Sequence, residues 1–205
     1  MDRIDNPSIG FVYVWLWVGL VPAALLFGQV HRRTNPLRTL LWFRGASVPS
    51  HDEPTGSLLP AAGALAVFLF LELVQPGGAT VPVLRWYAAA WVLWVVVGAL
   101  VTPTWIARAD PFEAFATTVA RLSPWARSAR GLLMWTNPLR NLAAWRAPRG
   151  LAAMSSVLLG GTLFDALSNT TWWVRGTQGL QDGTTALATA ALLGCMALVF
   201  GLFRL

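Results

Sequence analysis

Two acidic residues, each placed at the end of a long apolar segment, are the strongest candidates for chemistry in this sequence. Glu72 ends the segment before Gln75-Pro76, and Asp165 ends another just before Ser168 and Asn169. A carboxylate at the carboxyl end of a helix is disfavoured by the helix dipole, and within a membrane it needs water, a partner or a ligand. The sequence therefore predicts a polar ligand-binding site built from Glu72, Asp165, Ser168 and Asn169.

Local ion pairing is the alternative explanation for the two acids. Arg85 and Arg175 follow them in the sequence and are almost the only basic residues on the same side of the predicted membrane domain. They are the candidate ion-pair partners of Glu72 and Asp165. The sequence leaves both possibilities open, a site that receives a ligand and a pair of structural ion pairs.

Other residues that could carry chemistry give weaker patterns. The single cysteine, Cys195, lies in an apolar segment, and two histidines, His31 and His51, do not form a metal-binding signature. Neither a Gly-x-Ser-x-Gly nor a His-Glu-x-x-His motif is present. Gly160-Gly161 lacks the context of a phosphate loop and predicts close helix packing instead. We therefore predict no metal site and no cofactor.

The elements that must position these residues are membrane helices. The 205-residue chain is 56% hydrophobic and 12% charged, whereas a soluble domain carries about 25% charged residues. Long apolar segments of this kind span a lipid bilayer. We predict a single integral membrane domain of the all-α class, a bundle of about five transmembrane helices near residues 9–30, 58–74, 83–106, 150–167 and 184–205.

The arginines predict the orientation of these helices. The loop after the first predicted span holds four arginines and the loop after the third holds seven, whereas the opposite side holds three. By the positive-inside rule, the arginine-rich loops are cytoplasmic, the amino terminus is outside and the carboxyl terminus is inside. We expect the protein to lie in a bacterial plasma membrane, with Glu72 and Asp165 facing outward.

The arginine-rich loops also predict helices at the cytoplasmic surface. Asp110 is a suitable N-cap, Pro111 suits the first helical position, and Phe112, Phe115 and Val119 share one face. This pattern indicates an amphipathic helix in the headgroup region, beside anionic lipids that the arginines contact. The arginines do not alternate with exposed aromatic residues on one face, so nucleic-acid binding is not predicted.

A five-residue phrase occurs twice. Thr34-Asn35-Pro36-Leu37-Arg38 returns as residues 136–140, and each copy follows a span directed inward and precedes one directed outward. A parallel duplication of a two-helix unit explains this arrangement and is common in membrane transport folds. Alternatively, Asn-Pro simply forms a suitable start for a surface helix at two places.

Several phrases along the chain carry a resemblance, namely residues 11–14, 17–22, 26–28, 35–38, 60–62, 71–74, 110–113, 121–124 and 160–165. They resemble an actinobacterial family of multi-pass membrane proteins often labelled "fenitrothion hydrolase". The resemblance covers nearly the whole chain and is most specific at residues 160–165. It implies hydrolysis of an organophosphate ester, with no catalytic residues assigned. Members of that family are longer at both ends, so the resemblance also implies that this chain is either a fragment of a longer protein or a shortened form.

The sequence favours a transport-type or structural membrane component with an outward-facing polar site. A membrane-embedded hydrolase is the first alternative, and here only Asp165 with Ser168 offers a base beside a nucleophile. A second alternative is an assembly subunit whose polar residues bind a partner membrane protein.

Overall fold

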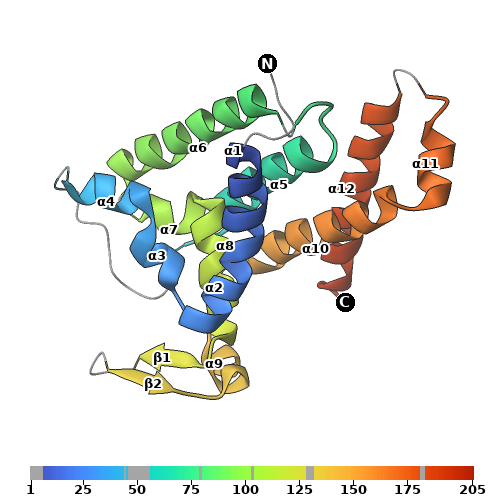
Figure 1. Cartoon of the computed structure of the whole chain (residues 1–205). Helices are drawn as coiled ribbons and strands as arrows, with labels where there is room; N and C mark the ends of the chain where they lie inside the picture. Colours follow the sequence, from blue (N-terminus) through green and yellow to red (C-terminus); the bar gives the residue numbers. More distant parts are fainter. Residues whose placement is uncertain are drawn as a thin grey trace.

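The computed structural model describes residues 7–43, 45, 56–78, 80–102, 104–127, 132–180 and 183–205. These residues are almost entirely helical, with one short β-hairpin (Figure 1). In chain order, the elements are α1 (Pro7–Gly10), the π-helix η1 (Phe11–Val18), α2 (Gly19–Phe27), α3 (Val30–Thr34), α4 (Pro36–Phe43), α5 (Leu59–Leu73), α6 (Val81–Val101), α7 (Trp105–Ala109), α8 (Pro111–Val119), the 3-10 helix η2 (Ala120–Leu122), β1 (Trp125–Arg127), β2 (Leu133–Trp135), α9 (Pro138–Ala144), α10 (Leu151–Ser168), α11 (Thr171–Thr177) and α12 (Thr184–Leu202).

Four helices in the described part of the chain, not five, are long and apolar enough to cross a membrane. They are the continuous helix Pro7–Phe27, then α6, α10 and α12. The predicted span at residues 58–74 is the exception, because α5 has only 15 residues, whereas a span needs about 20. Its apolar residues serve the core instead, since Ala61, Leu65, Phe68 and Leu69 are all buried.

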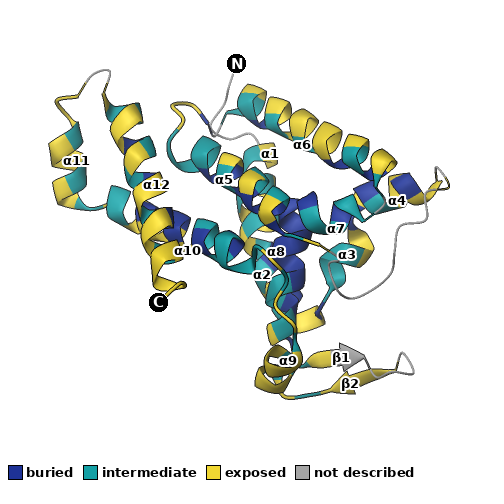
Figure 2. Ribbon diagram, turned by 180° about the vertical axis from the view of Figure 1, so that it is seen from behind, coloured by how far each residue is buried: buried dark blue, intermediate teal, exposed yellow. Residues whose placement is uncertain are grey.

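The four long helices have exposed outer faces (Figure 2), and these carry large apolar side chains. Trp15 is 76% exposed on η1, Trp86 is 77% exposed on α6, and Val101 is 81% exposed at the end of α6. Water-soluble proteins rarely expose apolar surface continuously on this scale. The exposed faces therefore fit a lipid bilayer environment.

Helix α8 lies in the centre of the molecule, which corrects its predicted place at the membrane surface. Seven of its residues are buried, Pro111 to Thr117. The rings of Phe112 and Phe115 pack against Trp17, and Phe112 also packs against Phe68. Sequence periodicity suggested a polar outer face, but the acid on that face, Glu113, finds its partners inside the protein. Contact of this helix with lipid headgroups is therefore not supported.

Helix α10 packs between α5 and α12 through its adjacent glycines, as predicted. A Cβ atom on Gly160 would stand 2.5 Å from the Cα of Met196 in α12, and one on Gly161 would stand 2.6 Å from the Leu69 side chain in α5. Only hydrogen fits at both positions. The two glycines thus set the separation of three helices, and α10 carries Asp165 at the end that leads to α11 (Figure 1).

The first long helix contains a π-helical segment upstream of Pro22. A proline in a helix lacks an N–H, and its ring crowds the carbonyl of the residue four positions earlier. That residue is Val18, at which η1 ends, so the altered hydrogen bonding lies directly before the proline. Within η1, Tyr13 and Trp17 both turn their rings onto Phe68 of α5.

Candidate functional site

Ser168 and Asn169 both form hydrogen bonds with Asp165, chiefly with its main-chain carbonyl. The Asn169 side-chain amide donates to the carbonyl oxygen of Asp165 at 2.8 Å and to its Oδ1 at 3.2 Å. The Ser168 hydroxyl donates to the same carbonyl at 2.9 Å. Carbonyl groups in the last turn of a helix have no partner within the helix. These two residues therefore cap α10, while the Asp165 side chain is exposed.

Glu72 lies in the last turn of α5, the helix that packs against α10. Its carboxylate is within electrostatic range of Asp165. The Glu72 Oε2 atom is buried and has no hydrogen-bond partner among the described residues. Burial of an acceptor without a partner is costly, which marks this atom as a place for water or a ligand.

The candidate cations Arg85 and Arg175 are both exposed. Within the described ranges, the ion pairs all involve Glu113, and neither of these arginines pairs with Glu72 or Asp165. The assignment of Arg85 and Arg175 as partners of the two acids therefore stays a prediction.

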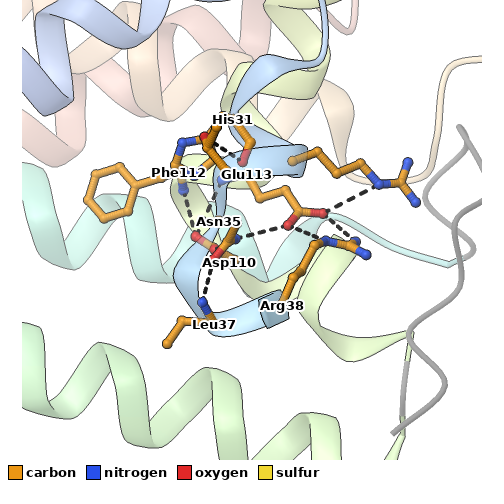
Figure 3. Close-up of polar contacts among 9 residues, drawn as sticks. His31, Asn35, Leu37, Arg38, Asp110, Phe112 and Glu113 are labelled. Carbon is orange, nitrogen blue, oxygen red and sulfur yellow. Dashed lines mark hydrogen bonds and ion pairs between the residues drawn. The ribbon is translucent and has the colours of Figure 1, made fainter. Parts of the chain in front are cut away.

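A second polar cluster, which the sequence analysis missed, lies in the protein interior (Figure 3). The Asn35 amide nitrogen donates to Oδ2 of Asp110 at 2.8 Å and to Oε2 of Glu113 at 3.0 Å. Arg38 donates two hydrogen bonds to Glu113, from Nε to Oε2 at 2.7 Å and from Nη2 to Oε1 at 2.5 Å. Asn35, Asp110 and Glu113 are at most 1% exposed. We call these four residues the inner cluster.

Asp110 is the fully buried member of the inner cluster. It caps α8, as predicted, because its Oδ1 accepts from the backbone N–H groups of Phe112 at 3.0 Å and Glu113 at 3.3 Å. The same oxygen accepts from the indole of Trp91 at 3.3 Å. Burial and the nearby charge of Glu113 raise the pKa of Asp110 to about 7, although the bonds from Asn35, Glu113 and Phe112 oppose the rise.

Two basic residues of α3, His31 and Arg32, lie near Glu113. Arg32 lies 3.9 Å from its Oε1, measured from Nε. Burial lowers the pKa of His31, and the charge of Glu113 opposes that effect. The His31 Nε2 atom is buried without a hydrogen-bond partner in the described part of the chain. Glu113 is therefore the anionic centre on which these basic side chains converge.

The inner cluster is formed by two matching corners of the chain. In the first corner, the five-residue helix α3 ends at Asn35, where the backbone is extended with φ −61° and ψ 114°. In the second corner, the five-residue helix α7 ends at Asp110, where the backbone is extended with φ −76° and ψ 111°. A proline then opens the next helix, and the charged residue follows three positions after the corner residue, Arg38 in one corner and Glu113 in the other. Corresponding residues contact each other, since Asn35 bonds Asp110 and Arg38 pairs with Glu113.

The repeated phrase at residues 136–140 shares only the local part of this geometry. The backbone N–H of Leu139 donates to Oδ1 of Asn137 at 2.9 Å, the same distance as between Leu37 and Asn35. In contrast to the first copy, Asn137 and Arg140 are exposed. The local similarity supports the simpler explanation, that Asn-Pro starts a helix twice; duplication of a larger unit stays a prediction. The sequence pattern that could have revealed the inner cluster is Asn-Pro-x-Arg at residues 35–38 together with Asp-Pro-x-Glu at residues 110–113, because the arginine and the glutamate are oppositely charged.

Comparisons with known proteins give no identification. No family model matches the chain, and no curated protein or solved structure matches it either. The hydrolase activity implied by the resemblance therefore has no support from these comparisons, and the argument for function depends on the two polar sites.

Proposed function

We propose that this protein is a transport-type membrane component whose polar site contains Glu72 and Asp165. One observation carries the proposal: the Glu72 carboxylate has a buried oxygen without a partner, lies within electrostatic range of a second acid, and forms no ion pair with an arginine among the described residues. Two neighbouring carboxylates in an apolar protein attract a cation or a proton. The low arginine content of the adjoining loops supports an outward-facing position for this site.

The alternative of a membrane-embedded hydrolase has less support. A serine nucleophile needs a base that accepts its hydroxyl proton. The Ser168 hydroxyl donates to the main-chain carbonyl of Asp165, which cannot act as that base. An assembly subunit would bind a partner membrane protein through the same polar residues, and co-purification of that partner would favour this alternative.

Ion flux into vesicles tests the proposed function. The purified protein is reconstituted into liposomes, and entry of Na⁺, K⁺, NH₄⁺ and H⁺ is measured under an imposed membrane potential. We expect flux of at least one of these ions above that of protein-free liposomes. Glu72→Gln and Asp165→Asn should each reduce that flux at least tenfold, because each removes one of the two carboxylates.

Arg140→Gln is the matched control, because Arg140 is an exposed charged residue remote from the polar site in the sequence and without an ion pair in the described structure. It should retain the flux of the unaltered protein. If all four ions give the flux of protein-free liposomes, or if the two acid variants behave like Arg140→Gln, the proposed function is wrong.

A further inference from the structure

Two tyrosines, Tyr13 and Tyr87, lie between the Glu72–Asp165 site and the inner cluster. They belong to different helices, η1 and α6, and they flank the same ring of α5. The ring centroid of Phe68 is 5.8 Å from that of Tyr13 and 5.4 Å from that of Tyr87. Tyr13 and Tyr87 are also within electrostatic range of each other. They are the only tyrosines in the sequence, and neither takes part in the two polar sites described above.

Tyr13 reaches the Glu72 end of α5. Its hydroxyl donates to the carbonyl of Gly78 at 3.4 Å, a long and therefore weak bond. Gly78 lies against the last turn of α5, since a Cβ atom placed on it would overlap the carbonyl oxygen of Leu71. Glu72 is the next residue, and it lies within electrostatic range of Tyr13. A hydroxyl held this loosely can rotate between Gly78 and a bridging water at Glu72.

Tyr87 reaches toward the inner cluster. It stands one helical turn before Trp91, so the two side chains share a face of α6. The Trp91 indole donates to Asp110 at 3.3 Å, and Tyr87 is within electrostatic range of Asp110. The Tyr87 hydroxyl is buried and makes no hydrogen bond within the described residues. A buried phenol oxygen is nearly always hydrogen-bonded, so an open position at this one marks a binding place for water.

We propose that Glu72, Tyr13, Tyr87 and Asp110 form a pathway that conducts protons across this domain. The Glu72 carboxylic acid releases its proton toward the Tyr13 oxygen, and the Tyr13 hydroxyl passes its own proton on to Tyr87. The Tyr87 hydroxyl then passes its own proton to the Asp110 carboxylate, with water bridging the gaps. Each tyrosine gains one proton and loses one, so only the two acids change charge. The pathway deepens the proposed function, because it names the proton as the species that the Glu72–Asp165 site handles.

Asp110 suits the role of proton acceptor at the second end. Asn35 donates a hydrogen bond to Asp110, and Glu113 lies in the same hydrogen-bond network. From α6, Trp91 donates to Asp110 and Tyr87 lies within electrostatic range of it. The basic residues around Glu113 are His31, Arg32 and Arg38. A buried acid whose pKa is about 7 exchanges its proton close to neutral pH. The inner cluster can then release the proton toward the arginine-rich side.

Proton entry into vesicles tests the pathway. The full-length protein is reconstituted with a pH-sensitive dye inside the liposomes, and a potassium diffusion potential drives protons inward. Tyr13→Phe and Tyr87→Phe should each reduce proton flux at least tenfold, because phenylalanine keeps the ring and removes the transferring hydroxyl. Thr162→Val is the matched control: it also removes a hydroxyl, but this one bonds only the Leu158 carbonyl of its own helix, at 3.0 Å. Thr162→Val should conduct normally.

The outcomes separate this inference from the proposed function. Tyr87→Phe removes a hydroxyl without a partner, so its melting temperature should match that of the unaltered protein, and a loss of flux cannot be ascribed to unfolding. Proton flux that Glu72→Gln abolishes and both tyrosine variants retain would overturn the pathway and leave the proposed function intact. Flux of Na⁺, K⁺ or NH₄⁺ that depends on Glu72, without any proton flux, would do the same. Absence of flux for all four ions would overturn both.

Discussion

Arg38 and Arg140 show how differently one residue type behaves in two copies of the same five-residue phrase. Arg38 forms two bonds with Glu113, which is buried, whereas Arg140 is exposed. Removal of one partner from a buried ion pair leaves the other charge without compensation, which costs far more than loss of a surface charge. The two arginines therefore form a natural pair for comparison.

The first prediction concerns this buried ion pair. Arg38→Gln and Glu113→Gln should each lower the free energy of unfolding by on the order of 3 kcal/mol, because each leaves a buried or half-buried charge unmatched. Arg140→Gln should change it by less than about 0.5 kcal/mol. Thermal unfolding in detergent, followed by circular dichroism, measures all three. Equal melting temperatures for the Arg38 and Arg140 variants would contradict the role of the inner cluster.

The second prediction concerns Asp110 and pH. Its pKa is raised from the ordinary 3.8 to about 7 in the folded protein. The contribution of Asp110 to the free energy of unfolding is fully present below about pH 4, where the folded and the unfolded protein both hold the proton. That contribution is lost as the pH rises through about 7. From pH 4 to 8 the loss should be on the order of a few kcal/mol.

Asp110→Asn removes the titrating group and keeps a side chain that caps a helix. The change also removes the oxygen atom that accepts the hydrogen bond from Asn35, but the loss of stability from this is the same at every pH. The slope of stability against pH is therefore the measurement, and it should become flatter over pH 4–8 in this variant. An unchanged slope would show that Asp110 is not the group that titrates.

At the scale of secondary-structure elements, α5 and α8 demonstrate why hydropathy misplaced two helices. The buried apolar residues of α5 pack in the protein core, and the helix is too short to cross a membrane although its composition resembles that of a span. In α8 the acid on the polar face, Glu113, binds Asn35 and Arg38 from another segment. A single-sequence pattern describes one helix at a time, whereas the burial of a charge depends on a partner that is about 75 residues away here.

The third prediction concerns the packing of α10 against α12. Gly160→Ala should destabilise the protein by about 1–3 kcal/mol, because its Cβ would meet the backbone of Met196. Gly194→Ala in α12 is the control, since a Cβ there has no neighbour within 4 Å. The control should be neutral or more stable by up to about 1 kcal/mol, as expected when alanine replaces glycine in a helix. Comparable losses of melting temperature in both variants would remove the close-contact argument.

At the scale of the whole molecule, the class of fold was predictable and the internal arrangement was not. Apolar segments identified the four long helices, and Asn-Pro and Asp-Pro marked three helix starts, at Pro36, Pro111 and Pro138. The equivalent positions of Glu72 and Asp165 suggested a shared site, and that site stays a prediction. The inner cluster and the hairpin of β1 and β2 could not be found, because both depend on the relative placement of segments far apart in the sequence.

The fourth prediction concerns the orientation in the membrane. With Cys195 replaced by alanine, a cysteine at exposed Gly179 should react with an impermeant thiol reagent from outside the cell, and one at exposed Leu139 should not. Gln75, exposed beyond α5, gives a second outer position that avoids the tight contact of Gly78 with Leu71. Reaction at Leu139 alone would reverse the orientation and place the Glu72–Asp165 site inside.

The matched corners at Asn35 and Asp110 have a consequence for how the sequence can diverge. A change at one corner alters what the other must supply, so positions 35 and 110, and positions 38 and 113, should vary as pairs among related chains. An acid at 35 would call for an amide at 110, and reversed charges at 38 and 113 would keep the same ion pair. The inner cluster would then be inherited as a rule of complementarity, with the residue types free to exchange between the corners.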